Sequence, residues 1–192
     1  LSRFASTDRD SFEKSYEKIF RLLFILSLPI AGNTTILAGK IIHLFFGSNF
    51  KEATVSLQIL IWAINLTFLE TLLGHILISL NKQRLLSFIY ALVFLINLLL
   101  DIILVPLYGY VGACIGSMAA YVIRTGLTYY YVSRYTYYLP LQKIILKPVI
   151  SVSIMSILIN LIKDMNLFFV ALLGVPIYLT TLFLLGDFCS IS

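Results

Sequence analysis

Six apolar runs constrain this sequence more than any other feature. They cover residues 19–46, 53–80, 85–105, 110–131, 148–162 and 167–185, and short polar segments separate them. A hydrocarbon core about 30 Å thick requires roughly 20 apolar residues per membrane-spanning helix. Because no strand-like alternation competes with these runs, the sequence predicts an all-α integral membrane protein with six transmembrane helices.

The composition excludes an ordinary water-soluble domain. Hydrophobic residues make up 60% of the 192 residues and charged residues 12%, whereas a globular chain is about half apolar and a quarter charged. The net charge of +5 is compatible with nucleic acid, but such a partner requires basic residues clustered on one solvated face. Here they are scattered between apolar runs. We therefore expect membrane lipids, and no nucleic acid, as partners.

Catalytic and metal-binding motifs are absent from the sequence. It contains no HExxH, no GxSxG, no phosphate-binding glycine loop and no Cys/His cluster at metal-ligand spacing. The two histidines, His43 and His75, fall near opposite predicted membrane faces, and Cys114 and Cys189 are expected to be free. We therefore expect no enzyme activity, no cofactor and no metal site.

The basic residues predict an orientation, because Lys and Arg favour cytoplasmic loops. Only Lys40, Lys51 and Lys163 fall on one side of the six-span topology. Eleven fall on the other, namely Arg3, Arg9, Lys14, Lys18, Arg21, Lys82, Arg84, Arg124, Arg134, Lys143 and Lys147. Both ends of the chain are therefore expected in the cytoplasm. Six tyrosines gather near residue 131 (Tyr129, Tyr130, Tyr131, Tyr135, Tyr137 and Tyr138), which is typical of a membrane interface rather than of a sugar-stacking platform.

Polar groups inside the spans are the candidates for function, because each is costly in lipid. One face of the 85–105 run carries such groups at steps of three and four: Ser87, Tyr90, Phe94, Asn97 and Asp101. In the next run small residues recur at steps of four (Gly112, Gly116 and Ala120), and one further step of four reaches Arg124. Such a ridge lets a neighbouring helix approach closely. We therefore expect Arg124 to point into protein, toward either a carboxylate or a substrate.

Two carboxylates lie within the predicted spans. Glu70 is about 15 Å from the end of its helix near Leu80, too deep for a short side chain to reach water, so it requires a partner, a proton or water. An ion pair with Arg124 is one explanation. Asp101 lies about 6 Å from a helix end and is either an interfacial carboxylate or a coupling site for H+ or Na+.

The second run presents two different sides. Gln58, Trp62 and Asn65 share one, and Thr67, Glu70, Thr71 and Gly74 share the other. Two different neighbouring helices are therefore expected. Asn65 and Asn97 are typical of hydrogen bonding between helices.

Three stretches resemble a known family. The first is LSRFASTDRDSFEKSYEKIFRLLFILSLPIAG, similar to a cytoplasmic linker leading into a helix with a central proline. The second is HLFFGSNFKEATVSLQILIWA, and the third is GHILISLNKQRLLSFIYALVFLINLLLDIILVPLYGYVGACIGSMAA, with a basic loop, an asparagine-bearing helix and a Pro-x-x-Gly turn. With these residues the chain resembles the multidrug, oligosaccharidyl-lipid and polysaccharide exporter superfamily, particularly its polysaccharide flippase branch.

This resemblance implies an architecture and a cargo. The chain would supply the last six of fourteen helices of a larger helical-bundle transporter. Residues 1–18 would be a cytoplasmic linker, 19–131 four helices of the carboxy-terminal lobe, and 132–192 two additional helices and a short tail. The cargo would be a polyprenyl-diphosphate-linked oligosaccharide, flipped across the cell membrane for surface polysaccharide biosynthesis beside glycan polymerases or glycosyltransferases.

An anionic diphosphate needs a hydrated, preferably cationic passage through the membrane. The implied substrate cavity comprises Arg124, Asn65, Asn97 and Tyr90, with Glu70 and Asp101 as ion-coupling candidates. Asp101 departs from the branch, which usually has a neutral residue there.

Two rival functions remain open at this point. A drug exporter of the same superfamily would use Glu70 or Asp101 as its H+ or Na+ site and would bind an apolar cation. A membrane-bound glycosyl or acyl transferase would need acidic or histidine side chains converging at one interface, and the sequence does not predict such a convergence.

Overall fold

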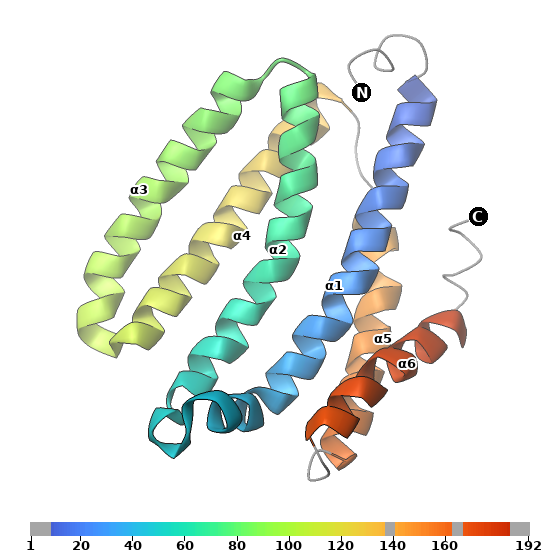
Figure 1. Cartoon of the computed structure of the whole chain (residues 1–192). Coiled ribbons are helices and arrows are strands. Elements are labelled where there is room, and N and C mark those ends of the chain that lie inside the picture. Colours follow the sequence, from blue (N-terminus) through green and yellow to red (C-terminus); the bar gives the residue numbers. More distant parts are fainter. Residues whose placement is uncertain (1–8, 137–140, 163–166, 185–192) are drawn as a thin grey trace. The chain divides into compact units, whose positions relative to one another are not determined.

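The computed structural model describes residues 9–136, 141–162 and 167–184. Six α-helices account for most of this part: α1 (Arg9–Phe46), α2 (Ala53–Ser79), α3 (Gln83–Tyr108), α4 (Tyr110–Tyr135), α5 (Leu141–Ile162) and α6 (Leu167–Leu184) (Figure 1). A short 3-10 helix, η1 (Ser48–Phe50), connects α1 to α2. The described residues contain no strand, so the all-α prediction is confirmed.

Four helices are long and apolar enough to cross a bilayer, by length and composition. Their spans are Lys18–Phe46, Ala53–Ser79, Gln83–Tyr108 and Tyr110–Tyr135. The apolar stretches described in α5 and α6 are shorter, Leu146–Leu161 and Leu172–Leu184. The chain is therefore a multi-pass membrane protein, with four of the six predicted spans found at full length.

Three helix boundaries differ from the sequence-based expectation. First, α1 begins at Arg9 rather than near Ile19. Second, α5 begins at Leu141, so Pro148 lies inside the helix rather than in its first turn. Third, α3 continues past Pro106 and ends at Tyr108; a proline this close to a helix end removes only one N–H from the last turns. Helix α1 contains Pro29 in its interior.

The chain forms two compact units that do not follow sequence order. Unit 1 comprises Leu1–Leu23 and Leu66–Leu139, and unit 2 comprises Phe24–Asn65 and Pro140–Ser192. Helices α1 and α2 therefore each contribute one part to each unit. This agrees with the expectation that α2 has two different neighbours. The sequential division into residues 1–18, 19–131 and 132–192 stays a prediction.

In unit 1, α3 and α4 form a tight antiparallel hairpin and lie side by side (Figure 1). Gly109 is the single residue between them, with φ 58° and ψ −141°, a conformation that only glycine adopts without strain. The ridge of small residues on α4 faces α3, as expected. A Cβ at Gly112 would overlap the Leu104 carbonyl group, and one at Gly116 would lie 2.8 Å from the Asp101 carboxylate.

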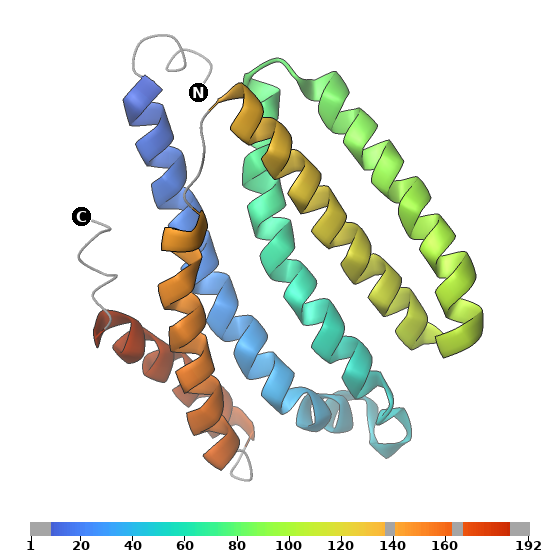
Figure 2. The same ribbon diagram turned by 180° about the vertical axis from the view of Figure 1, so that it is seen from behind.

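Unit 2 brings the later part of α1 against α5 and α6, and α5 packs on α6 (Figure 2). A Cβ at Gly32 would lie 2.8 Å from Val152 of α5, and one at Gly174 of α6 would lie 2.7 Å from Asn33. On the α2 side of this unit, the Gln58 side-chain amide donates a hydrogen bond of 3.0 Å to the Thr35 carbonyl group of α1. Unit 2 is thus closely packed through small residues.

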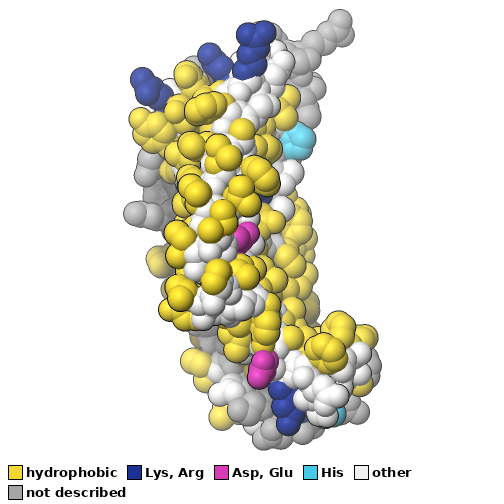
Figure 3. All heavy atoms as spheres, turned by 90° about the vertical axis from the view of Figure 1, so that its left-hand side faces the viewer, with side chains coloured by type: hydrophobic (Ala, Val, Ile, Leu, Met, Phe, Trp, Pro, Cys, Tyr) yellow, Lys and Arg dark blue, Asp and Glu magenta, His cyan; other side chains and the backbone are white. Residues whose placement is uncertain are grey.

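The outward face of α3 is strongly apolar, as the hydrophobic surface in Figure 3 shows. Phe88 and Phe94 are 64% and 66% exposed, and Leu99, Ile102 and Ile103 are also exposed. A soluble protein rarely displays a continuous apolar surface of this kind. On a membrane-spanning helix such a surface carries no penalty, because its surroundings are not water.

Candidate substrate cleft

A buried ion pair between two helices lies at the centre of the candidate site. Glu70 is 4% exposed in α2, and its Oε2 atom lies 3.4 Å from Nη2 of Arg124 in α4. The sequence predicted that Glu70 needs a partner, because an isolated carboxylate is costly away from water. Arg124 supplies that partner, although the Arg124 side chain itself remains 24% exposed.

Tyrosine side chains complete the surroundings of this pair. The Tyr90 hydroxyl group of α3 donates a hydrogen bond to Oε1 of Glu70. The Arg124 guanidinium carbon lies 5.4 Å from the Tyr90 ring centroid and 4.7 Å from that of Tyr121. Both distances suit cation–π attraction, which strengthens when the cation is partly desolvated. The Tyr90 and Tyr121 rings therefore both contact the guanidinium group, and the Tyr90 hydroxyl group also bonds its counter-ion, Glu70.

A cleft of about 270 Å³ runs along the groove between α3 and α4. Its walls are Tyr90, Val93, Phe94 and Asn97 from α3, and Ser117, Ala120, Tyr121 and Arg124 from α4. Three members of the predicted polar face of α3 thus line this cleft, namely Tyr90, Phe94 and Asn97. The Nε atom of Arg124 is buried and has no hydrogen-bond partner among the described residues. The guanidinium group therefore retains a donor beyond its ion pair.

Asn97 and Asp101 continue the polar face along α3. The Asn97 side-chain amide lies 3.5 Å from Oδ2 of Asp101, at the long limit of a hydrogen bond. The Oδ1 atoms of both residues are buried and unpartnered within the described part of the chain. Asn97 lines the cleft, whereas Asp101 lies against Gly116 and does not.

Asn65 is the one substrate-cavity candidate that the structure does not bring to the cleft. It belongs to unit 2 and is 4% exposed, and neither of its amide atoms has a hydrogen-bond partner among the residues described. Conversely, the sequence interpretation missed Ser117 and Tyr121. Their spacing with Arg124, at steps of four and three, places all three on one helix face, and this signal would have identified them.

Comparison with known proteins now places these features in a family. Residues 1–181 match the family described as Lipid II flippase MurJ. The chain belongs to the MurJ family. A second match is the probable low-salt glycan biosynthesis flippase Agl15 of Haloferax volcanii, 27% identical over 111 residues, which are 58% of this chain and 24% of that protein. No solved structure matches the chain.

Membership of the MurJ family agrees with the superfamily-level resemblance seen in the sequence. The family and the relative are both named for flippases, thus for transport rather than catalysis. The chain spans about a quarter of the length of the relative that it matches.

Proposed function

We propose that this chain forms part of a flippase that moves a polyprenyl-diphosphate-linked oligosaccharide across the cell membrane for surface polysaccharide biosynthesis. One observation carries this proposal: the Arg124 side chain, 24% exposed, lines a polar cleft between two helices that are long and apolar enough to span a membrane. Placing a central Arg in a membrane costs about 2.5–3.5 kcal/mol on insertion scales. Glu70 offsets part of this cost, and an anionic cargo would contact the exposed part of the Arg124 side chain.

The chemistry of the cleft suits a diphosphate better than an apolar cation. Arg124 presents a planar fork of donors that matches phosphate oxygens. Asn97, Ser117 and Tyr121 add neutral hydrogen-bonding groups to the same walls, suited to sugar hydroxyl groups. A drug exporter selective for cations would instead present a free carboxylate in the cleft. Glu70 is paired with Arg124 and bonded by Tyr90, and Asp101 does not line the cleft. These contacts favour the flippase over the exporter.

Ion coupling is a separate part of the proposal and is assigned to Asp101 rather than to Glu70. Asp101 has a buried carboxylate oxygen without a partner in the described part of the chain, whereas both Glu70 oxygens are engaged. An H+ or Na+ would satisfy such an oxygen. Asp101→Asn should therefore abolish the dependence of flipping on the ion gradient, while retained dependence would exclude Asp101.

Complementation tests the cargo assignment. In the full-length protein, Arg124→Ala should reach the membrane at normal levels yet fail to restore surface glycan in a flippase-null strain. Arg124→Lys should be partly active, because it keeps the charge but loses the planar fork. Lys51→Ala is the matched control, since it removes a positive charge from an exposed position outside the cleft. Full complementation by Arg124→Ala at matched protein levels would remove Arg124 from the cargo path.

A further inference from the structure

A second cluster of basic and aromatic side chains lies at one end of unit 1, where α2 ends, α3 begins and α4 ends. We call it the basic–aromatic patch, and its members are Lys82, Arg84, Tyr130, Arg134 and Tyr135. All five are exposed. Lys82 is the N-cap residue of α3, and Arg134 lies in the last turn of α4. Figure 3 shows Lys and Arg side chains gathered at the upper end of this face.

Aromatic rings organise the patch. The Lys82 ammonium group lies 4.8 Å from the Tyr135 ring centroid. That ring stacks on Tyr131, with centroids 6.4 Å apart and planes at 13°, and Tyr131 meets Tyr130 edge-on at 5.4 Å. Lys82 is therefore held in place by a ring face, which leaves its N–H donors free for an anion.

The patch has no neutralising carboxylate among the described side chains. Among the described residues, no ion pair is found for Arg84 or Arg134, and the Lys82 ammonium group lies over the Tyr135 ring. The acidic side chains that the structure describes are Glu52, Glu70 and Asp101. Glu52 precedes the opposite end of α2, Glu70 is paired with Arg124, and Asp101 lies in the second half of α3. Within the part of the chain that the structure describes, the patch is therefore a cluster of positive charge without a paired carboxylate.

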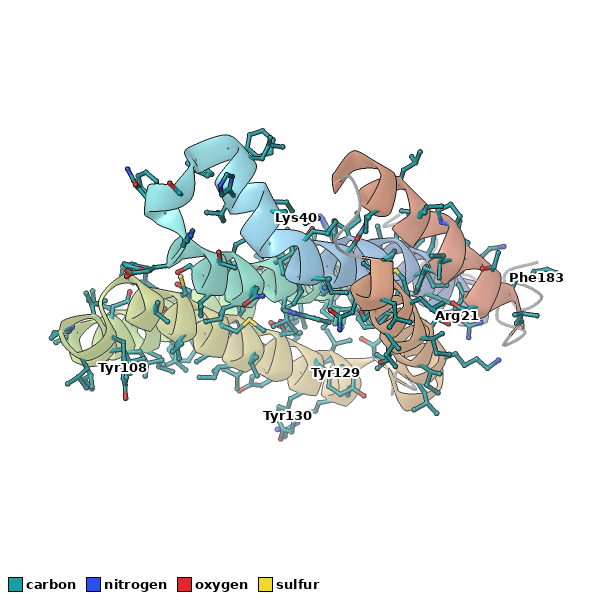
Figure 4. All side chains as sticks on the ribbon, turned by 90° about the horizontal axis from the view of Figure 1, so that it is seen from below. Arg21, Lys40, Tyr108, Tyr129, Tyr130 and Phe183 are labelled. Carbon is teal, nitrogen blue, oxygen red and sulfur yellow. The ribbon has the colours of Figure 1, made fainter. Side chains whose placement is uncertain are left out.

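The position of the patch identifies the level of the membrane that it faces. Phe88 is 64% exposed and follows Arg84 by one helical turn, a rise of about 6 Å, so the exposed apolar surface of α3 begins just beside the charges. Tyr130 is 56% exposed and projects away from α4 (Figure 4). Exposed tyrosines next to basic residues are typical of the headgroup layer. The charges therefore lie where lipid phosphates are found.

We propose that the basic–aromatic patch is a binding surface for the phosphate-bearing headgroups of anionic phospholipids. Basic clusters at helix ends bind such headgroups by charge and by hydrogen bonds to phosphate oxygens. The patch is separate from the cleft, because none of its five members lines the cleft. Its occupant is bulk membrane lipid, so this inference does not depend on the identity of the cargo.

Native mass spectrometry of the full-length protein tests the proposal, with an equimolar mixture of phosphatidylglycerol and phosphatidylcholine as the probe. The wild-type protein should retain phosphatidylglycerol preferentially. The triple variant Lys82→Gln, Arg84→Gln, Arg134→Gln should lower that preference by a factor of about five or more. About fivefold is the contribution of a single basic residue near an anionic surface, and the variant removes three. The charge-preserving variant Lys82→Arg, Arg84→Lys, Arg134→Lys should keep it. Tyr135→Leu, which frees Lys82 from its ring, should lower it less than the triple variant.

Two control arms distinguish the alternatives. Lys51→Gln removes an exposed charge outside the patch, at the opposite end of α2, and should leave the lipid preference unchanged. Millimolar inorganic phosphate should not compete, because it lacks the acyl chains that hold a lipid beside Phe88. Unchanged preference in the triple variant would overturn the proposal. Competition by inorganic phosphate, or stronger patch-dependent binding of a polyprenyl diphosphate than of phosphatidylglycerol, would also overturn it.

Discussion

Arg124 and Glu70 form an ion pair between α4 and α2, with Nη2 and Oε2 3.4 Å apart and the Tyr90 hydroxyl group bonded to the other carboxylate oxygen. Glu70 is only 4% exposed, whereas the Arg124 side chain is 24% exposed. This asymmetry separates the two roles. Glu70 fixes the position of the guanidinium group from inside the bundle, and the exposed part of Arg124 lines the cleft.

The first prediction concerns the carboxylate of this pair. Glu70→Gln should lower the stability of the purified full-length protein by about 1–3 kcal/mol, because Arg124 loses its counter-ion but can still turn toward the cleft. The dependence of flipping on the ion gradient should remain. Thermal unfolding in detergent and a gradient-dependent flipping assay measure the two quantities.

A double-mutant cycle supplies the control for this pair. Glu70→Gln combined with Arg124→Gln should be less destabilising than the sum of the single changes, since no unpaired charge remains. Strict additivity would mean that the two residues do not interact. Loss of gradient dependence in Glu70→Gln alone would assign the coupling ion to Glu70.

The second prediction isolates the Tyr90 hydroxyl group. Tyr90→Phe keeps the ring beside Arg124 but removes the hydrogen bond to Glu70, and hydrogen bonds to charged groups contribute about 1.5–3 kcal/mol. The unfolding temperature should therefore fall. Tyr108→Phe is the matched control, because Tyr108 is 61% exposed at the other end of α3 and should tolerate the change (Figure 4). Equal behaviour of the two variants would show that the Tyr90 hydrogen bond contributes nothing to stability.

The third prediction tests the close approach of α4 to α3. A methyl group at Gly112 would overlap the Leu104 carbonyl group, and backbone atoms cannot move aside as a flexible side chain can. Gly112→Ala should therefore cost about 1–3 kcal/mol of stability. Gly126→Ala, on the same helix with open space around it, should be neutral or slightly stabilising because alanine favours helix. Size-exclusion profiles after graded heating compare the two, and the reverse order of stability would contradict this packing.

The fourth prediction concerns topology. Lys51 follows η1 before α2, and Lys82 follows α2, so a single crossing by α2 separates them. In a full-length background lacking Cys114 and Cys189, cysteines placed singly at Lys51 and Lys82 should react with a membrane-impermeant reagent from opposite sides. The uneven distribution of Lys and Arg predicts that position 82 is cytoplasmic. Labelling of both positions from one side would exclude a spanning α2.

Local rules explain what the sequence by itself determined. The apolar runs fixed the number and type of helices, since helix length and hydropathy depend only on neighbouring residues. Steps of three and four placed Tyr90, Phe94 and Asn97 on one face, and all three line the cleft. The small-residue ridge of α4 indicated a closely packed neighbour, and that neighbour is α3.

Only the tertiary structure decided which helices meet and which polar groups pair. Glu70 and Arg124 are separated in the chain by all of α3, and spacing along one helix carries no information on such a long-range contact. Spacing along α2 placed Asn65 and Glu70 on different sides, but the assignment of each part of α1 and α2 to a particular compact unit was beyond local rules. The physical reason is that a buried charge needs a partner close in space, which need not be close in sequence. The sequence shows that Glu70 needs such a partner, whereas the packing of α2 against α3 and α4 determines that the partner is Arg124.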